Sequence, residues 1–319
     1  MNDERRKLLI VGDNPFQGIS HLSQERARNR GGDSVSPEDH AADVVLASLK
    51  NCADGFSFSV SERTLSILRT LRKRESIDQI NLYAMVPYAF EYVRIATQTG
   101  TPGLVKRFAK QVALSGDIRA VLEGLWSVVR MNPEGFMDTY LAYELSRIKA
   151  ATGKKGKLVS VLLNEVIADM SLALGFDWLF KSFISYLSKR RITPGFNTRN
   201  FPYLVNRFNE WGINLNEILI VTPFNGAGFQ MNPSKEECEK TLINLSSHNV
   251  LAISVLAAGY FKPSEAVDYL GGLSNIEGVI IGVSTEQQAQ DTFKLFDEQF
   301  ASKKRDLGFS STKAQGAIG

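Results

Sequence analysis

The sequence predicts a single α/β domain with the (β/α)8 TIM-barrel fold, and three observations support this prediction. Eight short apolar, β-rich runs occur along the 319 residues, and each is followed by a segment with helical spacing. Strand–helix alternation of this kind builds a parallel sheet. No linker interrupts the series, and such a barrel needs about 250 residues before insertions. A doubly wound open sheet is the alternative, but the first turn, GDNPFQG, lacks the usual GxGxxG pattern.

The clearest strand–helix–strand unit lies in residues 191–234. Its two apolar runs are Ile192–Phe196 and Ile218–Phe224, and each is followed by an asparagine and a polar or small residue. The segment between the runs carries apolar residues at helical spacing, namely Phe201, Leu204, Val205, Phe208 and Trp211. Polar residues therefore follow the predicted strands, which is where α/β folds place their functional groups.

The other elements follow from the same periodicity. Ser36-Pro37 and Ser61 are typical helix starts, and an apolar helix follows the fourth strand to about Leu187. In chain order the predicted strands are Leu8–Val11, Gly55–Val60, Ile80–Val86, Leu158–Leu163, Ile192–Phe196, Ile218–Phe224, Leu251–Leu256 and Gly278–Ile281.

Three segments depart from the repeat. Residues 89–153 carry several helical patterns separated by Gly and Pro, which predicts a helical insertion between strands three and four of a barrel domain spanning residues 1–302. The polar segment Phe16–Pro37 predicts a long loop over the barrel mouth or a mobile lid. Residues 303–319 are polar and small, which predicts a flexible C-terminal tail.

Composition restricts the class of protein. Hydrophobic residues make up 44% and charged residues 22%, as in globular domains. A net charge of +3, with basic residues clustered only locally, argues against a nucleic-acid partner. The N-terminus does not have the pattern of a signal peptide, and no segment approaches the roughly 18 apolar residues of a membrane span. Two cysteines far apart, Cys52 and Cys238, fit a reducing compartment, so a cytoplasmic location is expected.

Functional side chains of a barrel lie at the C-terminal ends of its strands. Asp13 follows the first strand and Glu165 the fourth, and such carboxylates can share acid–base work. His21, in the loop GISHLS, is a candidate proton donor. Alternatively, Asp13 caps a turn, Glu165 favours its helix N-terminus and His21 is solvated. Ser59 and Glu62 have the spacing of a capping box. Three histidines without metal-site spacing predict no zinc centre.

Amides and phenols on the same rim are candidates for substrate binding. Asn197 and Asn225 end adjacent strands and could hold a planar ligand from two sides. The alternative is that asparagine is there because it tolerates left-handed turn conformations. The full set of predicted substrate-binding residues is Asn14, Tyr83, Tyr88, Asn164, Asn197 and Asn225.

The last two strand ends, AAGYFKPSE and GVSTEQQ, resemble anion cradles. Small residues let backbone N–H groups approach a ligand, and each turn leads to a helix N-terminus. Ser264 and Thr285 could also be ordinary N-caps. The residues predicted to bind a phosphate group or a cofactor here are Gly259, Lys262, Gly282, Ser284 and Thr285.

Within residues 157–296 the chain resembles the aldo-keto reductase superfamily. GFNTRNFPYLVNRFNEWGI resembles that family's fifth strand and helix, and VTPFNGAGFQMNP resembles its sixth-strand segment. LAISVLAAGYFKPSEAV and GVIIGVSTEQQAQ resemble its closing strands. The resemblance implies a TIM barrel, an amide-rich site at Asn225, and closing strands that bind the pyrophosphate and 2′-phosphate of NADPH.

The first half of the chain departs from that family. The family's tetrad has an Asp and a Tyr after the second strand, a Lys on the third and a His on the fourth. The corresponding segments here, GFSFSVSERTL, NLYAMVPY and VSVLLNEV, lack them, and EQQAQ lacks the basic residue expected at the 2′-phosphate. The tetrad cannot be carried over, so NAD(P) has no specific support.

Three functions therefore compete. The first is an enzyme of lyase or isomerase type, using carboxylate acid–base chemistry on a small polar substrate that could be phosphorylated. The second is an NAD(P)H-dependent oxidoreductase in which Tyr83 or Tyr88 replaces the missing acid. The third is a non-catalytic barrel that acts as a sensor or scaffold through the insertion at 89–153, which is also the predicted surface for a homo-oligomer.

Overall fold

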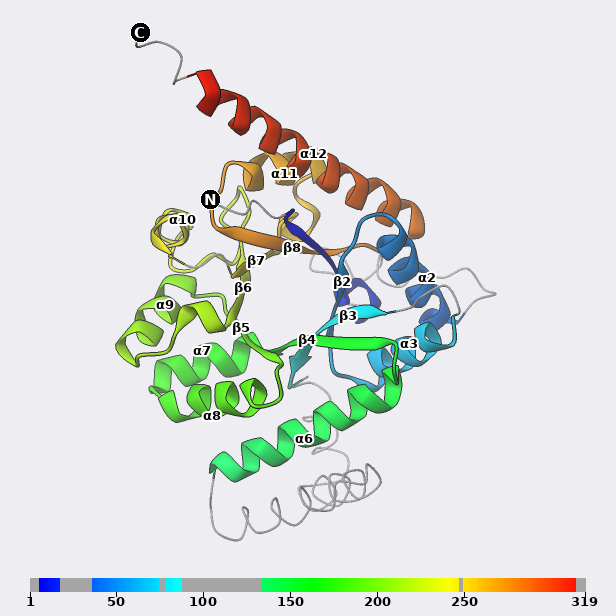
Figure 1. Cartoon of the computed structure of the whole chain (residues 1–319), viewed down its shortest axis with the longest axis vertical. Helices are drawn as coiled ribbons and strands as arrows, with labels where there is room; N and C mark the ends of the chain where they lie inside the picture. The colour runs from blue at the N-terminus through cyan, green and yellow to red at the C-terminus, as the bar shows by residue number, and fades with distance from the viewer. Residues whose placement is uncertain (1–5, 18–35, 75–78, 88–132, 247–248, 314–319) are drawn as a thin grey trace.

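The computed structural model describes residues 6–17, 36–74, 79–87, 133–246 and 249–313. Eight parallel strands pair in sequence order, and the eighth pairs with the first, so the sheet closes into a barrel (Figure 1). The predicted (β/α)8 fold is confirmed. The strands are β1 (Leu8–Gly12), β2 (Gly55–Ser59), β3 (Ile80–Val86), β4 (Gly156–Leu163), β5 (Thr193–Asn197), β6 (Leu219–Pro223), β7 (Val250–Ile253) and β8 (Ile276–Gly282).

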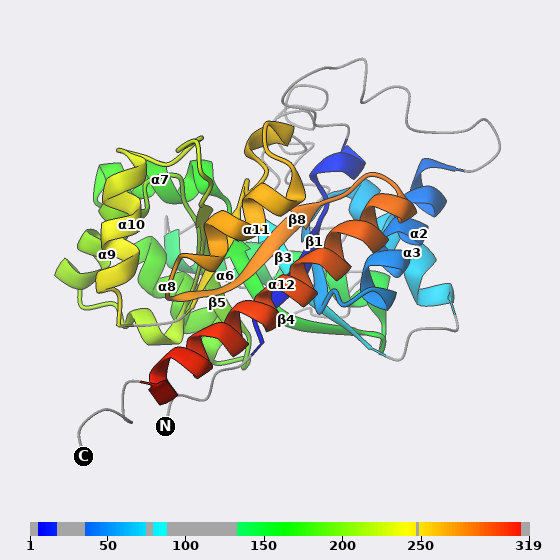
Figure 2. The same ribbon diagram turned by 90° about the horizontal axis from the view of Figure 1, so that it is seen from above.

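Helices surround the barrel, with α9 and α10 on one side and α2 and α3 on the other (Figure 2). The α-helices in the described part are α2 (Pro37–Lys50), α3 (Glu62–Lys73), α6 (Pro133–Thr152), α7 (Glu165–Leu174), α8 (Asp177–Ser188), α9 (Phe201–Glu210), α10 (Lys235–Asn244), α11 (Pro263–Gly271) and α12 (Glu286–Lys313). Three short 3-10 helices are η1 (Asn14–Gln17), η2 (Leu215–Glu217) and η3 (Ala257–Gly259).

Two predicted helix starts are confirmed, and one capping pattern is wrong. Ser36 caps α2 and Ser61 caps α3, each by accepting a backbone N–H. The capping box of α3 pairs Ser61 with Thr64 rather than Ser59 with Glu62, because Ser59 is still the last residue of β2. Strand β2 therefore includes Ser59, and the residue that caps α3 is Ser61, two positions later than the SVSE pattern suggests.

The single helix predicted after the fourth strand is two helices. Gly175 adopts a left-handed conformation, with φ of 72°, and ends α7. Glycine takes this conformation without steric cost, so it commonly ends a helix. The chain turns there, and α8 begins two residues later and packs against β5 and α6. α7 is therefore an additional helix directly after the C-terminal end of β4.

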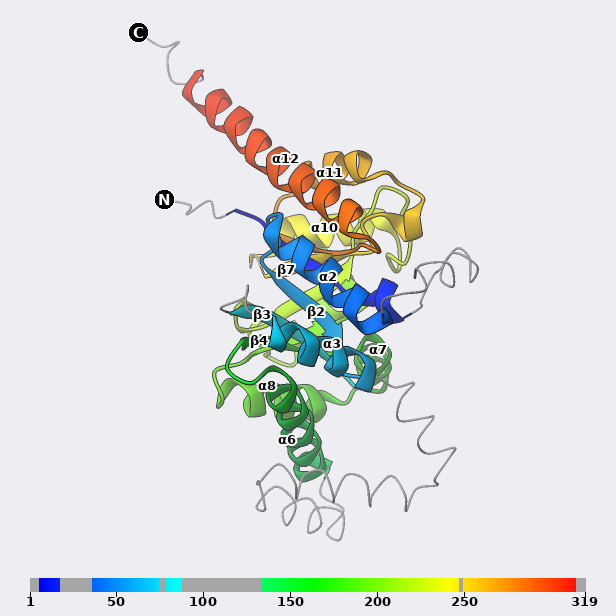
Figure 3. The same ribbon diagram turned by 90° about the vertical axis from the view of Figure 1, so that its right-hand side faces the viewer.

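Three other predicted segments are covered only in part. Residues 89–132 of the predicted insertion lie outside the described residues, and most of the remainder is the 20-residue helix α6. α12 runs past Ser302 to Lys313 and extends away from the barrel (Figure 3), so residues 303–313 are helical instead of forming the predicted tail. The predicted lid, apart from η1 and the start of α2, also lies outside the described residues.

The core has two parts, as a barrel requires. The larger lies between strands and helices, where Phe180, Phe196 and Phe208 form a cluster of aromatic rings 5.1–5.4 Å apart. The smaller fills the barrel interior with Ile10, Tyr83, Leu162, Leu219, Val221 and Leu251. Interior glycines make room for the large residues. A Cβ at Gly55 would lie 3.0 Å from the Tyr83 ring, and a Cβ at Gly195 would lie 2.4 Å from the Leu162 side chain.

Candidate active site at the barrel mouth

Two hydrogen-bonded clusters lie at the C-terminal ends of the strands, and each contains one of the two predicted carboxylates. Glu165 belongs to a cluster at the ends of β4 and β5, and Asp13 to one at the ends of β1 and β2. Among the described residues, the hydrogen-bond partners of Asp13 and those of Glu165 do not overlap, so the two carboxylates lie at one mouth in separate networks.

Glu165 is held by amides on one side and faces a cation on the other. Its Oε2 accepts hydrogen bonds from Nδ2 of Asn164 at 2.9 Å and from Nδ2 of Asn197 at 3.1 Å. Its Oε1 lies 3.5 Å from the Arg199 guanidinium. The side chain keeps 21% of its surface exposed. This is a carboxylate with a fixed orientation that solvent and a small molecule can still reach.

The local chain explains why these groups converge. Asn164 caps α7 by accepting the N–H of Val166, so its amide NH2 is left to hold Glu165. Asp169, one turn further along α7, accepts the Thr198 hydroxyl and the Arg199 N–H. Burial raises the pKa of Asp169 above its usual range, while these two donors oppose that effect. The loop after β5 is therefore fastened to α7, which positions Arg199 beside Glu165.

Met85, at the end of β3, is a site residue that sequence reasoning missed. Its sulfur lies 3.4 Å from Nδ2 of Asn197 and 3.7 Å from Nδ2 of Asn164. Its carbonyl accepts the N–H of Val60 at the end of β2. The Oδ1 of Asn197 is buried without a hydrogen-bond partner. A methionine within a strand carries no sequence signal that marks it as a site residue. Arg199 was also not predicted, although its position two residues after a strand end could have indicated it.

Asp13 is almost completely buried, with 4% of its surface exposed. Its Oδ2 accepts the N–H of Ser59 at 2.9 Å and Nε2 of Gln17 at 3.1 Å, and the same Gln17 nitrogen donates to Oγ of Ser61. Burial raises the pKa of Asp13 to about 6, and the hydrogen bonds from Ser59 and Gln17 only partly offset this effect. The carboxyl group therefore changes protonation state near neutral pH.

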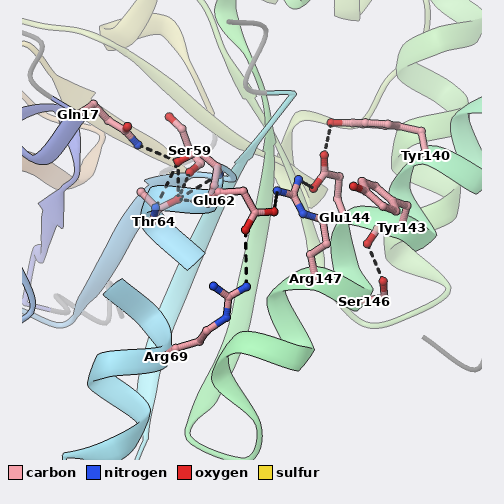
Figure 4. A network of polar contacts seen from close by, with 11 residues as sticks. Gln17, Ser59, Glu62, Thr64, Arg69, Tyr140, Tyr143, Glu144, Ser146 and Arg147 are labelled. Atoms are coloured by element: carbon pink, nitrogen blue, oxygen red, sulfur yellow. Dashed lines mark hydrogen bonds and ion pairs between the residues drawn. The ribbon is translucent and has the colours of Figure 1, made fainter. Parts of the chain in front are cut away.

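A second polar network adjoins the Asp13 cluster (Figure 4). Glu62, the first residue of α3, pairs with Arg147 of α6 at 3.0 Å, and Arg147 also pairs with Glu144 at 3.0 Å. Tyr140 donates its hydroxyl to Glu144. This network fastens α6 to the helix that begins at the mouth, and its Glu144 and Arg147 are fully enclosed.

Two predicted substrate-binding residues have structural positions instead. The Tyr83 ring leans over Gly55 at the start of β2. Burial, then the charges of Asp54 and Glu277 near the N-terminal ends of β2 and β8, raise its pKa to about 12. Tyr83 therefore lies inside the barrel and away from the mouth. Asn225 is fully buried and uses both amide atoms to bind the backbone of Phe229, so it closes the loop after β6.

The predicted anion cradle uses its donors internally. The N–H of Ser284 donates to Gln288, the N–H of Gln288 donates to Thr285, and the N–H of Lys262 donates to Glu265. Gly259, with φ of 91°, lies in a tight turn in which its own N–H and those of Tyr260 and Phe261 bind turn carbonyls. Gly282 packs against Pro15. Thr285 therefore caps α12, as the alternative interpretation held, whereas α11 is capped at Lys262 and Ser264 already lies inside that helix.

The same geometry bears on a nicotinamide cofactor, which the sequence resemblance of residues 157–296 implies. A pyrophosphate needs free N–H donors and positive charge. Here the donors at Lys262 and Ser284 are occupied, and Glu265 and Glu286 lie in the first turns of α11 and α12. The closing strands therefore do not fit a dinucleotide pyrophosphate in this conformation.

Of the remaining predicted site residues, one is exposed and two lie outside the described part of the chain. Asn14 is exposed at the start of η1, whereas His21 and Tyr88 lie outside the described residues. Within the described ranges, no group of three His, Cys, Asp or Glu residues is placed to hold a metal ion. Of the helices in that part of the chain, none has the length and apolar character needed to cross a bilayer.

Comparisons with known proteins identify the fold. No protein-family model matches the sequence, and no curated protein matches it. Two solved structures of a candidate aldo-keto reductase from Pseudomonas aeruginosa are similar to this chain, each with a TM-score of 0.54 and 10% identity. The alignments cover 92% of this chain and 91% and 90% of those chains. The chain thus has the TIM-barrel fold of these structures, and at this identity the likeness concerns the fold alone.

Proposed function

We propose that the chain is an enzyme of lyase or isomerase type that moves a proton on a small polar substrate, with Glu165 as the acid–base group. One observation carries the proposal. A carboxylate at the end of a barrel strand is fixed by two amides, faces a guanidinium and remains partly exposed. General acid–base catalysis needs a carboxyl group with this fixed orientation and access.

The residues around Glu165 have distinct parts in this function. Asn164 and Asn197 hold Oε2, which leaves Oε1 directed at the space beside Arg199. A substrate C–H or O–H group that approaches Oε1 gives up its proton there, and the Arg199 guanidinium balances the negative charge that develops on the substrate. Asp13 supplies a second carboxyl group at the same mouth, where its raised pKa keeps both protonation states available. A phosphate group on the substrate is not required.

Glu165→Gln is expected to lower the rate of proton exchange about 10²- to 10⁴-fold, because glutamine keeps the shape but cannot accept the proton. The assay incubates the protein in D₂O with a panel of small hydroxy and keto acids, sugars and sugar phosphates, and detects loss of C–H signals by proton NMR. Glu298→Gln, on an exposed position of α12, is the matched control and should exchange like the wild type.

Rescue separates proton transfer from simple loss of structure. Glu165→Asp keeps the carboxyl group and should retain part of the exchange activity. Equal rates for the wild type and Glu165→Gln, on a compound that the wild type exchanges, would refute the role of Glu165. Absence of exchange across the whole panel would count against proton transfer on these substrate classes.

A second candidate is an NAD(P)H-dependent oxidoreductase, which the likeness in fold to aldo-keto reductases favours. The absent tetrad and the occupied donors at Ser284 and Lys262 oppose it. We expect NADPH and NADH to leave the tryptophan fluorescence unchanged apart from inner-filter absorption, up to millimolar cofactor. A saturable quench that Gln288→Ala strengthens would support the oxidoreductase, because that variant frees the Ser284 N–H.

A further inference from the structure

The backbone of the loop after β5 is held in place by hydrogen bonds around Arg199. Asp169 of α7 accepts the Thr198 hydroxyl and, on Oδ2 at 3.0 Å, the N–H of Arg199. The Thr198 hydroxyl oxygen accepts the N–H of Asn200 at 3.0 Å. The carbonyl of Arg199 accepts the N–H of Asn232 at 3.0 Å. Thr198 is completely buried, so its hydroxyl has no competition from water. The Arg199 side chain therefore starts from a backbone position that α7 helps to determine.

The contact between Arg199 and Glu165 is looser than a direct ion pair. The guanidinium nitrogen lies 3.5 Å from Oε1 of Glu165. Direct hydrogen bonds between a guanidinium and a carboxylate measure about 2.7–2.9 Å. Asp169 lies one helical turn from Glu165 on the same side of α7, and its charge attracts the same guanidinium. The guanidinium is thus attracted by two carboxylates, and it remains 44% exposed.

We propose that Asp169 is a positioning residue, which keeps Arg199 close enough to Glu165 to balance charge but too far away to occupy Oε1. This inference rests on the proposed function, in which Oε1 takes the proton of the substrate. A direct hydrogen bond from the guanidinium would fill Oε1 and exclude the substrate proton from it. An Arg199 side chain that turned away to solvent would no longer balance the charge on the substrate. Asp169 acts through Thr198 and Arg199 and needs no contact with the substrate.

Proton-exchange kinetics test the positioning role. Asp169→Ala removes the acceptor of both loop donors and should lower kcat about 10- to 100-fold, because a misplacement of about 1 Å has an effect of that size. KM should change less than about twofold, as expected for an interaction that matters in the transition state. Thr198→Val removes the hydroxyl at nearly constant volume and should act in the same way, whereas Thr198→Ser should recover most of the lost rate. Asp177→Ala, at an exposed position of α8, is the control and should match the wild type.

A double variant shows whether Asp169 acts through Arg199. Arg199→Gln lowers the rate by itself, because it removes the charge beside Glu165. Adding Asp169→Ala to Arg199→Gln should then lower the rate by no more than about a further twofold, since residues that act through one another do not have additive effects. Losses that multiply in full would overturn the positioning role, because Asp169 would then affect the site by a route that does not include Arg199.

Amide hydrogen exchange, measured by NMR on the full-length protein, tests the contact without a substrate. The N–H of Arg199 should exchange at least about tenfold faster in Asp169→Ala than in the wild type or Asp177→Ala, because it loses its acceptor. Thr198→Val makes the same comparison at the N–H of Asn200, even if Asp169→Ala does not fold. Unchanged amide exchange in both variants would overturn the inference, whatever the activity. Faster amide exchange in a protein whose wild type exchanges no substrate proton would refute the proposed function, and the positioning role with it.

Discussion

Replacement of Arg147 by methionine is expected to destabilise the protein by about 3–5 kcal/mol, the cost of removing one partner from a buried ion pair. Arg147 and Glu144 have side chains that are 3% and 1% exposed and lie 3.0 Å apart. Methionine fills similar space but leaves the Glu144 carboxylate enclosed without that cation. Urea unfolding followed by circular dichroism measures the change.

An exposed pair within α3 provides the control for the buried pair within α6. Arg69 lies 3.7 Å from Glu62, and both side chains are more than two-fifths exposed. Arg69→Met should cost less than about 1 kcal/mol, as surface ion pairs do. The double variant Glu144→Leu with Arg147→Met should recover much of the loss, because no charge is then left enclosed. Equal losses in Arg147→Met and Arg69→Met would contradict the assignment of a buried pair.

The fold could be predicted from sequence because its signals are local. The run Ile218–Phe224 contains β6, and its asparagine end coincides with the barrel mouth. Ser36 and Ser61 were recognisable caps because each is followed by a helical pattern. The division of one helix into α7 and α8 was missed, since the glycine at 175 looks like any tolerated glycine until its φ of 72° is known.

The site was predictable only in part, because its contacts are long-range. Glu165 and Asn197 were identified as strand-end polar residues, but their hydrogen bond joins positions 32 residues apart. Tyr83 was misplaced because strand position alone does not tell toward which end of the barrel a ring leans. Ser284 and Thr285 fit both an anion cradle and an N-cap. The bonds that Gln288 makes with Ser284 and Thr285 favour the cap.

Replacement of Asp13 by asparagine is expected to stabilise the protein at neutral pH while impairing its function. The pKa of this carboxyl group rises from its ordinary value of 3.8 to about 6 because the group is buried. Below pH 3.8 the group is protonated in both the folded and the unfolded chain, so it costs nothing. As the pH rises from 3.8 to about 6, the carboxyl group ionises in the unfolded chain but stays protonated in the folded one, so the folded state is progressively destabilised.

The expected size of that effect follows from the two pKa values. Each pH unit between them is worth about 1.4 kcal/mol, so the penalty reaches about 3 kcal/mol above pH 6. Asparagine carries no charge, and its carbonyl oxygen can still accept from Ser59 and Gln17. The free energy of unfolding of Asp13→Asn should therefore match the wild type near pH 4 and exceed it increasingly up to about pH 6.

Urea unfolding at a series of pH values measures this difference. Asp177→Asn is the control, because Asp177 is exposed and its hydrogen bond to Lys181 lowers its pKa, so removing its charge should bring no gain at neutral pH. A loss of stability in Asp13→Asn at pH 7 would mean that the ionised carboxylate is a structural anchor. A gain in stability together with slower proton exchange would mean that the fold tolerates a destabilising carboxyl group at the mouth, as enzymes do where function requires it.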